Sequence, residues 1–168
     1  FLISPATPIL VDVDGQTQLI VYGGRTINGL DPATGTVFWT HGHETTGDMN
    51  SSTPVWGDDN ILFMTSAYNG GGRALRLSRE GEVTHVEELW FNTQLKVMFA
   101  NVLRLGDYVY GSSGDFGPAF LTAVNVKTGE TAWRERGYGR SNLLHADGKT
   151  IILSEDGTLM LATLSPDG

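Results

Sequence analysis

The sequence has no cysteine, few cations and no long hydrophobic run in its 168 residues. The absence of cysteine excludes disulfides, thiolate metal ligands and cysteine nucleophiles, and it is compatible with either redox compartment. Nineteen acidic residues against eleven Lys and Arg give a net charge of −8, which argues against a nucleic-acid partner. The apolar stretches reach only about 4–6 residues, so we expect no transmembrane segment.

A helical period and a recognisable catalytic set are missing as well. No segment repeats apolar residues at the 3.6-residue spacing for long enough to predict a helix. The chain has no Ser-His-Asp order and no pair of carboxylates at a recognisable catalytic spacing. What the chain does have is 22 glycines, spaced along its length rather than clustered, and these predict many tight turns.

The turns divide the chain into repeats. The glycines Gly35, Gly81 and Gly129 recur at intervals of about 47 residues, and a second series of turns reads DVDGQ, WGDDN, LGDYV and HADGK. Runs such as QLIVYG, NILFMTS, YVYGS and TIILS lie between them and are typical of strands. A unit of four antiparallel strands has the size of a β-propeller blade. We expect one all-β domain over residues 1–168, with blades at about 7–40, 53–90, 100–136 and 141–168, the last lacking its outermost strand.

Two units carry the same signature. The stretch DPATGTVFW, residues 31–39, returns as NVKTGETAW, residues 125–133. We interpret Gly35, Gly81 and Gly129 as turn residues, and Trp39 and Trp133 as indoles that pack between blades with their N–H groups bonded. In the second unit the aligned position holds His85, and Trp90 comes later in the sequence.

These stretches resemble the tryptophan-docking repeat of the PQQ-type, or quinoprotein-like, β-propellers. The resemblance spans essentially the whole chain and implies rings of seven or eight blades, of which four are half. It also implies a superfamily that contains both quinone-dependent dehydrogenases and cofactor-free scaffolds. Half a ring leaves apolar blade faces open to water, so we expect a fragment of a longer chain, two copies that close a ring, or four tightly closed units; we favour the fragment.

The connections between blades are the predicted binding face, because propellers carry their sites on loops held by a rigid scaffold. Residues near the inner-strand entrances are candidates to line the channel, and an Arg-Tyr cluster is a candidate partner contact. The resemblance implies that, in the quinone-dependent dehydrogenases, Asn, Arg, Lys and acidic groups at these entrances hold quinone and calcium. The alternative is a polar channel lining filled with water. The candidates are Asn50, Ser51, Ser52, Asn92, Gln94, Lys96, Asn101, Arg136, Tyr138, Arg140 and Asn142.

Two loops raise further hypotheses. The loop HGHETTGDMNSSTP offers His41, His43, Glu44 and Asp48 as ligands for zinc or calcium, although a solvated connection explains the same residues. The stretch GDFGPAF, residues 114–120, is either a long hairpin loop that caps the barrel edge or an exposed binding loop.

The leading functional hypothesis is a non-catalytic propeller of an exported bacterial protein, in the periplasm or outside the cell, that binds a protein or small ligand at its loop face. No cofactor is expected. The alternative is a dehydrogenase that uses pyrroloquinoline quinone with calcium to oxidise an alcohol or sugar. The paired cysteines that the resemblance implies for many such enzymes are absent, and no acidic base is matched by motif, so no catalytic residue is predicted.

Overall fold

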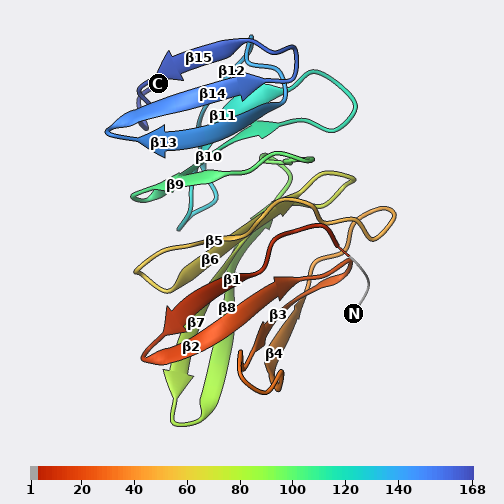
Figure 1. Cartoon of the computed structure of the whole chain (residues 1–168), viewed down its shortest axis with the longest axis vertical. Coiled ribbons are helices and arrows are strands. Elements are labelled where there is room, and N and C mark those ends of the chain that lie inside the picture. Colours follow the sequence, from red (N-terminus) through yellow and green to blue (C-terminus); the bar gives the residue numbers. More distant parts are fainter. Residues whose placement is uncertain (1–3) are drawn as a thin grey trace.

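The computed structural model describes residues 4–168, and within that range all regular structure is β-strand. The strands form four antiparallel sheets, each made of consecutive strands, which we call blades 1 to 4 (Figure 1). Blade 1 comprises β1 (Ile9–Val13), β2 (Gln16–Tyr22), β3 (Thr26–Leu30) and β4 (Val37–Gly42). Blade 2 comprises β5 (Val55–Trp56), β6 (Ile61–Ser66), β7 (Gly71–Glu80) and β8 (Val83–Asn92). Blade 3 comprises β9 (Leu103–Leu105), β10 (Tyr108–Ser113), β11 (Phe120–Asn125) and β12 (Thr131–Glu135), and blade 4 comprises β13 (Ser141–Ala146), β14 (Lys149–Ser154) and β15 (Leu159–Ala162).

The turn glycines permit the hairpins that the sequence predicts. In blade 1, Gly35 donates its backbone N–H to the carbonyl oxygen of Asp31 at 2.8 Å, and its φ of 75° suits a residue without a side chain. Gly129 repeats this arrangement in blade 3, where its N–H donates to Asn125 at 2.9 Å with φ of 77°. The side chains of Asp31 and Asn125 accept backbone N–H groups just after them, so each turn is stabilised from within.

The four blades stack in chain order as an open arc, with blade 1 and blade 4 at opposite ends (Figure 1). This arrangement confirms the all-β propeller fold. It rules out the alternative in which four units close tightly on themselves. Blade 4 has three strands, so β15 is its outer edge.

Blade 2 corrects the sequence alignment. Each four-stranded blade has a β-bulge beside a small residue on its third strand, and that residue pairs with a tryptophan on the fourth: Gly29 with Trp39, Ala74 with Trp90, and Ala123 with Trp133. Trp90, and not His85, therefore takes the tryptophan position. The displacement has a simple cause: β7 and β8 pair as far as Glu80 and Val83, which makes this hairpin longer than its counterparts.

Three hydrophobic clusters lie between successive blades. Between blades 1 and 2, Ile20 and Tyr22 pack with Leu62 and Leu75; the next cluster includes Phe63 and Val109, and the last includes Tyr110 and Ile152. Because neighbouring residues of a strand point to opposite faces, an inner blade buries both of its faces. In β6, Leu62 packs toward blade 1 and Phe63 toward blade 3, and both are fully buried. The alternation along each strand thus supplies two interfaces.

Candidate binding face

The connections between blades and the loops of the second hairpins lie at one end of the antiparallel sheets. They are residues 43–54, 93–102 and 136–140, together with 23–25, 67–70 and 114–119. These loops run along the right-hand side of Figure 1, and we call this end of the molecule the loop face. The predicted binding residues lie on or near it, at the positions described below.

The candidates of the first connection are used within the fold. Asn50 is fully buried, and its Nδ2 donates to the carbonyl oxygens of Gly23, at 2.8 Å, and Gly24, at 3.1 Å. Ser52 donates its hydroxyl to the carbonyl oxygen of Ala100 at 3.0 Å. The Oδ1 atom of Asn50 and the hydroxyl of Ser51 are buried and have no hydrogen-bond partner in the described chain. Asn50 and Ser52 therefore hold neighbouring loops together through hydrogen bonds to backbone carbonyl oxygens.

The candidates of the second connection tie blades 2 and 3 to their neighbours. Asn92 donates to the carbonyl oxygen of Gly129 at 2.8 Å, and its own Oδ1 accepts the backbone N–H of Gln94. Asn101 makes a two-point contact with the backbone of Leu143 in blade 4: it donates to the carbonyl oxygen at 2.6 Å and accepts the N–H at 2.8 Å. Gln94 is exposed and Lys96 lies 3.6 Å from Asp115. Asn92 and Asn101 therefore link neighbouring blades through hydrogen bonds to backbone groups.

Arg140 organises the third connection. Its guanidinium donates to the carbonyl oxygens of Asp115 and Gly117 and pairs with the Glu155 carboxylate at 3.2 Å. These hydrogen bonds hold the 114–119 loop in place. Arg136 lies with its guanidinium carbon 5.2 Å from the centre of the Phe120 ring. Tyr138 is half-buried and packs on the cluster between blades 3 and 4, whereas Asn142 is exposed.

The predicted metal ligands do not converge. His41 lies 3.3 Å from Glu88, Asp48 forms a bidentate ion pair with Arg25, and Glu44 is exposed. No group of three or more His, Asp or Glu side chains suited to a metal occurs among residues 4–168. The loop turns His43 into the protein, whereas Glu44 is exposed and His41 and Asp48 are partly buried in contacts of their own.

His43 is buried and lies in a polar network with Ser66 and Arg73. A histidine beside a serine is the composition of a catalytic pair, but the direction of the hydrogen bonds differs. Its Nδ1 accepts a hydrogen bond from Arg73 at 3.3 Å, and its Nε2 lies 2.7 Å from the Ser66 hydroxyl. Because the arginine can only donate, the ring proton is on Nε2, which donates to Ser66. Burial and the nearby charge of Arg73 lower the pKa of His43 to about 3. A neutral imidazole in this tautomer cannot remove a proton from the Ser66 hydroxyl.

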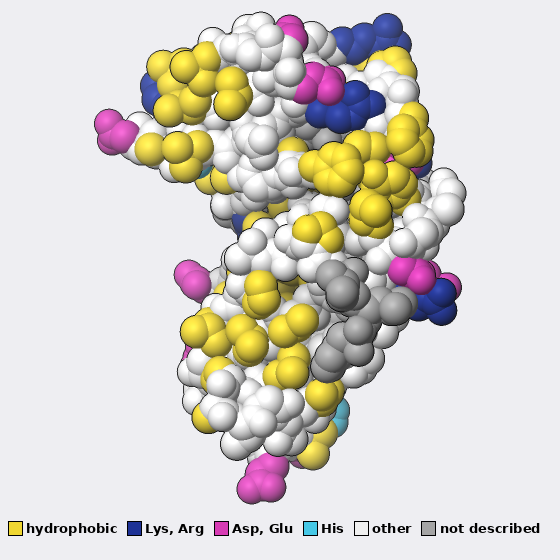
Figure 2. Space-filling view, turned by 45° about the vertical axis from the view of Figure 1, so that its right-hand side comes forward, with side chains coloured by type: hydrophobic (Ala, Val, Ile, Leu, Met, Phe, Trp, Pro, Cys, Tyr) yellow, Lys and Arg dark blue, Asp and Glu magenta, His cyan; other side chains and the backbone are white. Residues whose placement is uncertain are grey.

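An exposed aromatic cluster is the most distinctive feature of the loop face. Tyr68, Phe99 and Phe116 come from three different loops, and the Tyr68 ring centre lies 6.4 Å from that of Phe99 and 5.7 Å from that of Phe116. Phe99 is 65% exposed and Phe116 is 81% exposed. Hydrophobic side chains gather on the right of Figure 2, where these loops lie. The GDFGPAF stretch forms the hairpin loop between β10 and β11, with Phe116 exposed. Tyr68 and Phe99 were missed because nothing in the sequence shows that their loops meet the 114–119 loop.

A pocket of about 370 Å³ adjoins this cluster. It is lined by Phe99, Ala100, Arg140, Asn142, Leu153, Ser154 and Glu155. The pocket therefore combines an aromatic wall with one exposed amide and a paired arginine. Arg140 and Asn142 were predicted from the sequence; Phe99 and Glu155 come to the site only through the fold.

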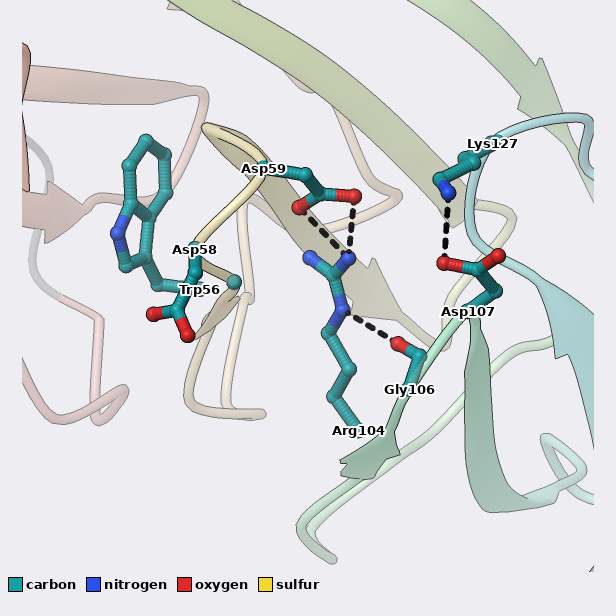
Figure 3. Close-up of a pocket in the computed structure, with 8 residues that line it drawn as sticks. Trp56, Asp58, Asp59, Arg104, Gly106, Asp107 and Lys127 are labelled. Atoms are coloured by element: carbon teal, nitrogen blue, oxygen red, sulfur yellow. Dashed lines mark hydrogen bonds and ion pairs between the residues drawn. The ribbon is translucent and has the colours of Figure 1, made fainter.

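A second pocket, of about 380 Å³, lies at the opposite end of the sheets between the first turns of blades 2 and 3 (Figure 3). Its charges are paired: Arg104 donates to both carboxylate oxygens of Asp59 at 2.7 Å, and Lys127 lies 2.7 Å from Asp107. Arg104 also donates to the carbonyl oxygen of Ile61 at 2.9 Å. The arginine therefore braces two blades, and the walls of this pocket are structural.

Several of the residues that the sequence offered for quinone and calcium make contacts within the chain. The amides expected to bind them, Asn50, Asn92 and Asn101, are hydrogen-bonded to backbone groups of this chain. The cations Lys96 and Arg140 are paired with carboxylates. Calcium needs several oxygen ligands in one place, and the described chain gathers no such acidic group.

Stacked antiparallel sheets, three of them four-stranded and each with a tryptophan at the same place, define the class of this protein: it is a β-propeller built from PQQ-like repeats. The sequence model of the family described as outer membrane protein assembly factor BamB matches residues 4–166, so the chain belongs to that family. The chain matches none of the curated proteins searched. Among solved structures, it is similar to the computationally designed Ika4 protein, with a TM-score of 0.66 and 16% identity over 95% of this chain and 92% of that one. That likeness concerns the fold alone. No helix among residues 4–168 has the length and apolar character needed to cross a membrane.

Proposed function

We propose that this chain is a non-catalytic binding module whose loop face takes an extended peptide segment of a partner protein. The observation that carries the proposal is the cluster of Phe99 and Phe116 around Tyr68, in which both phenylalanines are exposed and Phe99 lines a pocket. Aromatic residues of this kind are enriched at the centres of protein interfaces because they bury large rigid surfaces at low entropic cost. The loop that carries Phe116 is held by hydrogen bonds from Arg140 to its backbone carbonyl oxygens, which suits a preformed site.

The family adds an expectation about location. Its description names an outer-membrane assembly factor, which agrees with a binding role in the periplasm or outside the cell. We propose an exported protein. Fractionation of the producing cells tests this part, and a purely cytosolic distribution would contradict it.

The binding proposal is tested by selecting peptides from a random display library on the immobilised chain. We expect enriched peptides to lose about tenfold or more in affinity when Phe116→Ser is introduced, because loss of a central aromatic contact costs about 1.4 kcal/mol or more. Val83→Ser is the matched control, since Val83 is also exposed, at 57%, but lies in the turn region at the other end of β8.

Two outcomes would contradict the proposal. One is peptides that bind the Phe116→Ser and Phe99→Ser variants as tightly as the parent chain, or no enrichment at all. The other is an absorbance change on adding pyrroloquinoline quinone and calcium together with dye reduction by alcohols, which would establish the dehydrogenase instead.

A further inference from the structure

Two arginines beside the loop face have no acidic partner among residues 4–168. Seven of the eleven Lys and Arg side chains pair with a carboxylate. Arg79 and Lys149 donate to uncharged oxygens instead. Arg134 and Arg136 are exposed, and neither guanidinium makes an ion pair or a hydrogen bond within the part of the chain that the structure describes. Their charge is therefore available to a ligand.

Both guanidinium groups lie over the same aromatic ring. The guanidinium carbon of Arg134 is 4.6 Å from the centre of the Phe120 ring, and that of Arg136 is 5.2 Å from it. Arg134 pairs with Thr122 of β11, so it projects to the same side of blade 3 as Phe120. Glu135 projects to the other side, because neighbouring residues of a strand alternate. The two positive charges thus lie together, without the carboxylate that separates them in the sequence.

This surface lies on the side of blade 3 that faces blade 2. Phe120 precedes Leu121, which packs toward blade 4, so Phe120 projects to the opposite side. Phe120 also pairs with Ser113, whose hydroxyl donates to the carbonyl oxygen of Gln94 at 3.0 Å in the connection after blade 2. Blades 2 and 3 both have four strands and lie inside the stack (Figure 1). The surface is therefore formed by blades that have a neighbour on each side.

Blade 2 has a similar contact between an arginine and a phenylalanine, but that contact serves the fold. The guanidinium carbon of Arg73 lies 4.5 Å from the centre of the Phe91 ring. Arg73 also pairs with Glu88 and donates to His43 at 3.3 Å. A carboxylate of the chain thus neutralises this arginine, whereas the two arginines over Phe120 require an acidic group from outside the chain.

The arginine pair is within reach of the exposed aromatic cluster. Phe116 and Phe120 are four residues apart, and four residues span at most about 14 Å. An extended peptide rises about 3.3 Å per residue, so a segment of about five residues reaches from one ring to the other.

We propose that Arg134 and Arg136 bind a carboxylate side chain of the peptide segment that docks on Phe99 and Phe116. This inference rests on the proposed function and adds the chemistry of the ligand: an apolar residue with an aspartate or glutamate about three to five residues away. A guanidinium presents N–H donors in a planar fork that matches the two oxygens of a carboxylate. The net charge of −8 opposes attraction to an anionic lipid surface, which favours a single acidic side chain as the ligand.

The sequences of peptides selected on the immobilised chain test the inference. We expect Asp or Glu to be enriched about three to five positions from an apolar residue. Such a peptide should lose about three- to tenfold in affinity when Arg134→Gln and Arg136→Gln are combined, because exposed ion pairs contribute modestly. Arg76→Gln combined with Lys149→Gln is the matched control. It removes two exposed positive charges elsewhere, and we expect less than about a twofold change because salt screens distant charges.

A change in the peptide connects the arginines to the carboxylate. Replacing the acidic residue of the peptide by its amide should lower affinity for the parent chain by about the same three- to tenfold factor. With the Arg134→Gln, Arg136→Gln chain the same replacement should have no effect, because the partners of the carboxylate are already absent.

Three results overturn the inference. Peptides that depend on Phe116 but lack an acidic residue, or that bind the Arg134→Gln, Arg136→Gln chain as tightly as the parent, contradict it and leave the proposed function intact. Failure to enrich any peptide overturns both proposals. Co-sedimentation with vesicles of phosphatidylglycerol that is lost in the same double variant would assign the two arginines to a lipid surface instead.

Discussion

Gly29 lies directly beneath the indole of Trp39, and this contact requires the absence of a side chain. A Cβ atom at Gly29 would overlap the Nε1 and Cε2 atoms of Trp39. The same indole donates to Gln18 at 2.8 Å, and Gln18 donates to Thr84 of blade 2 at 2.8 Å. One glycine therefore allows a hydrogen-bonded connection between two blades to form.

We expect Gly29→Ala to destabilise the fold by about 1–3 kcal/mol, since the added methyl group overpacks a buried site. Gly42→Ala is the matched control: it lies on β4 with no atom within 4 Å of an added Cβ, so it should be neutral or slightly stabilising. Urea unfolding measures both free energies. Equal effects of the two substitutions would show that the Trp39 contact does not constrain position 29.

His43 makes the stability of the fold sensitive to acid. Its pKa is lowered to about 3, first by burial and then by the charge of Arg73. In the unfolded chain the imidazole takes up its proton near pH 6.5, so between about pH 6.5 and 3 the unfolded state binds more protons. Stability therefore falls as the pH is lowered through this range.

We expect His43→Gln to remove up to about 1.4 kcal/mol of this loss per pH unit between pH 6 and 4. The measurement is the free energy of unfolding of both proteins at several pH values. The other titrating groups are common to both, so the difference between the two curves reports His43. Parallel curves would mean that His43 is protonated in the folded protein.

At the scale of single elements, the blades are joined by side chains that cross from one to the next. Trp90 donates to the carbonyl oxygen of Val126 and Trp133 to that of Ser165, both at 2.8 Å. Asn101 and Arg104 make similar crossings at opposite ends of blade 3. These bonds satisfy buried polar groups that the sheet ladders leave unpaired.

A substitution of Arg104 tests whether the shape of the side chain, or only its charge, matters in these contacts between blades. Its side chain is 9% exposed, and it donates to Ile61, Gly106 and Asp59 from one planar group. We expect Arg104→Lys to cost about 1–3 kcal/mol although the charge is kept, because an ammonium cannot reach all three acceptors.

Arg76→Lys is the control for that substitution. Arg76 is half-exposed and lies 3.7 Å from Glu87 in a surface ion pair, which contributes little. Thermal unfolding of both variants decides the matter. A loss as small for Arg104→Lys as for Arg76→Lys would indicate that a general positive charge is sufficient between blades 2 and 3.

At the scale of the whole molecule, the apolar clusters between successive blades hold the sheets together. Phe63 of β6 is fully buried in the cluster between blades 2 and 3. We expect Phe63→Ala to destabilise the fold by about 3–5 kcal/mol, because removal of the ring leaves a cavity between two blades. Thermal unfolding measures the loss against Val83→Ala at an exposed position, and equal effects of the two substitutions would contradict the prediction.

Strands, turns and the propeller class were predictable from the sequence because they depend on local patterns. A short apolar run with β-branched residues, as in QLIVYG, specifies a strand, and Asp31 with Gly35 specifies a turn through local hydrogen bonds and the positive φ of glycine. The same reasoning failed at His85. Equal spacing was assumed there, whereas the β7–β8 hairpin is longer and brings Trp90 into the tryptophan position.

The candidate site was only partly predictable, because side-chain direction depends on tertiary packing. The sequence by itself determined a repeated all-β fold, and it pointed to the loops that carry Arg140 and Asn142. Only the tertiary structure buried His43, engaged Asn50 and Asn101 in hydrogen bonds to backbone carbonyl oxygens, and brought Tyr68 into contact with Phe99 and Phe116. Local patterns specify strands and turns, but contacts between distant residues exist only once the blades have packed.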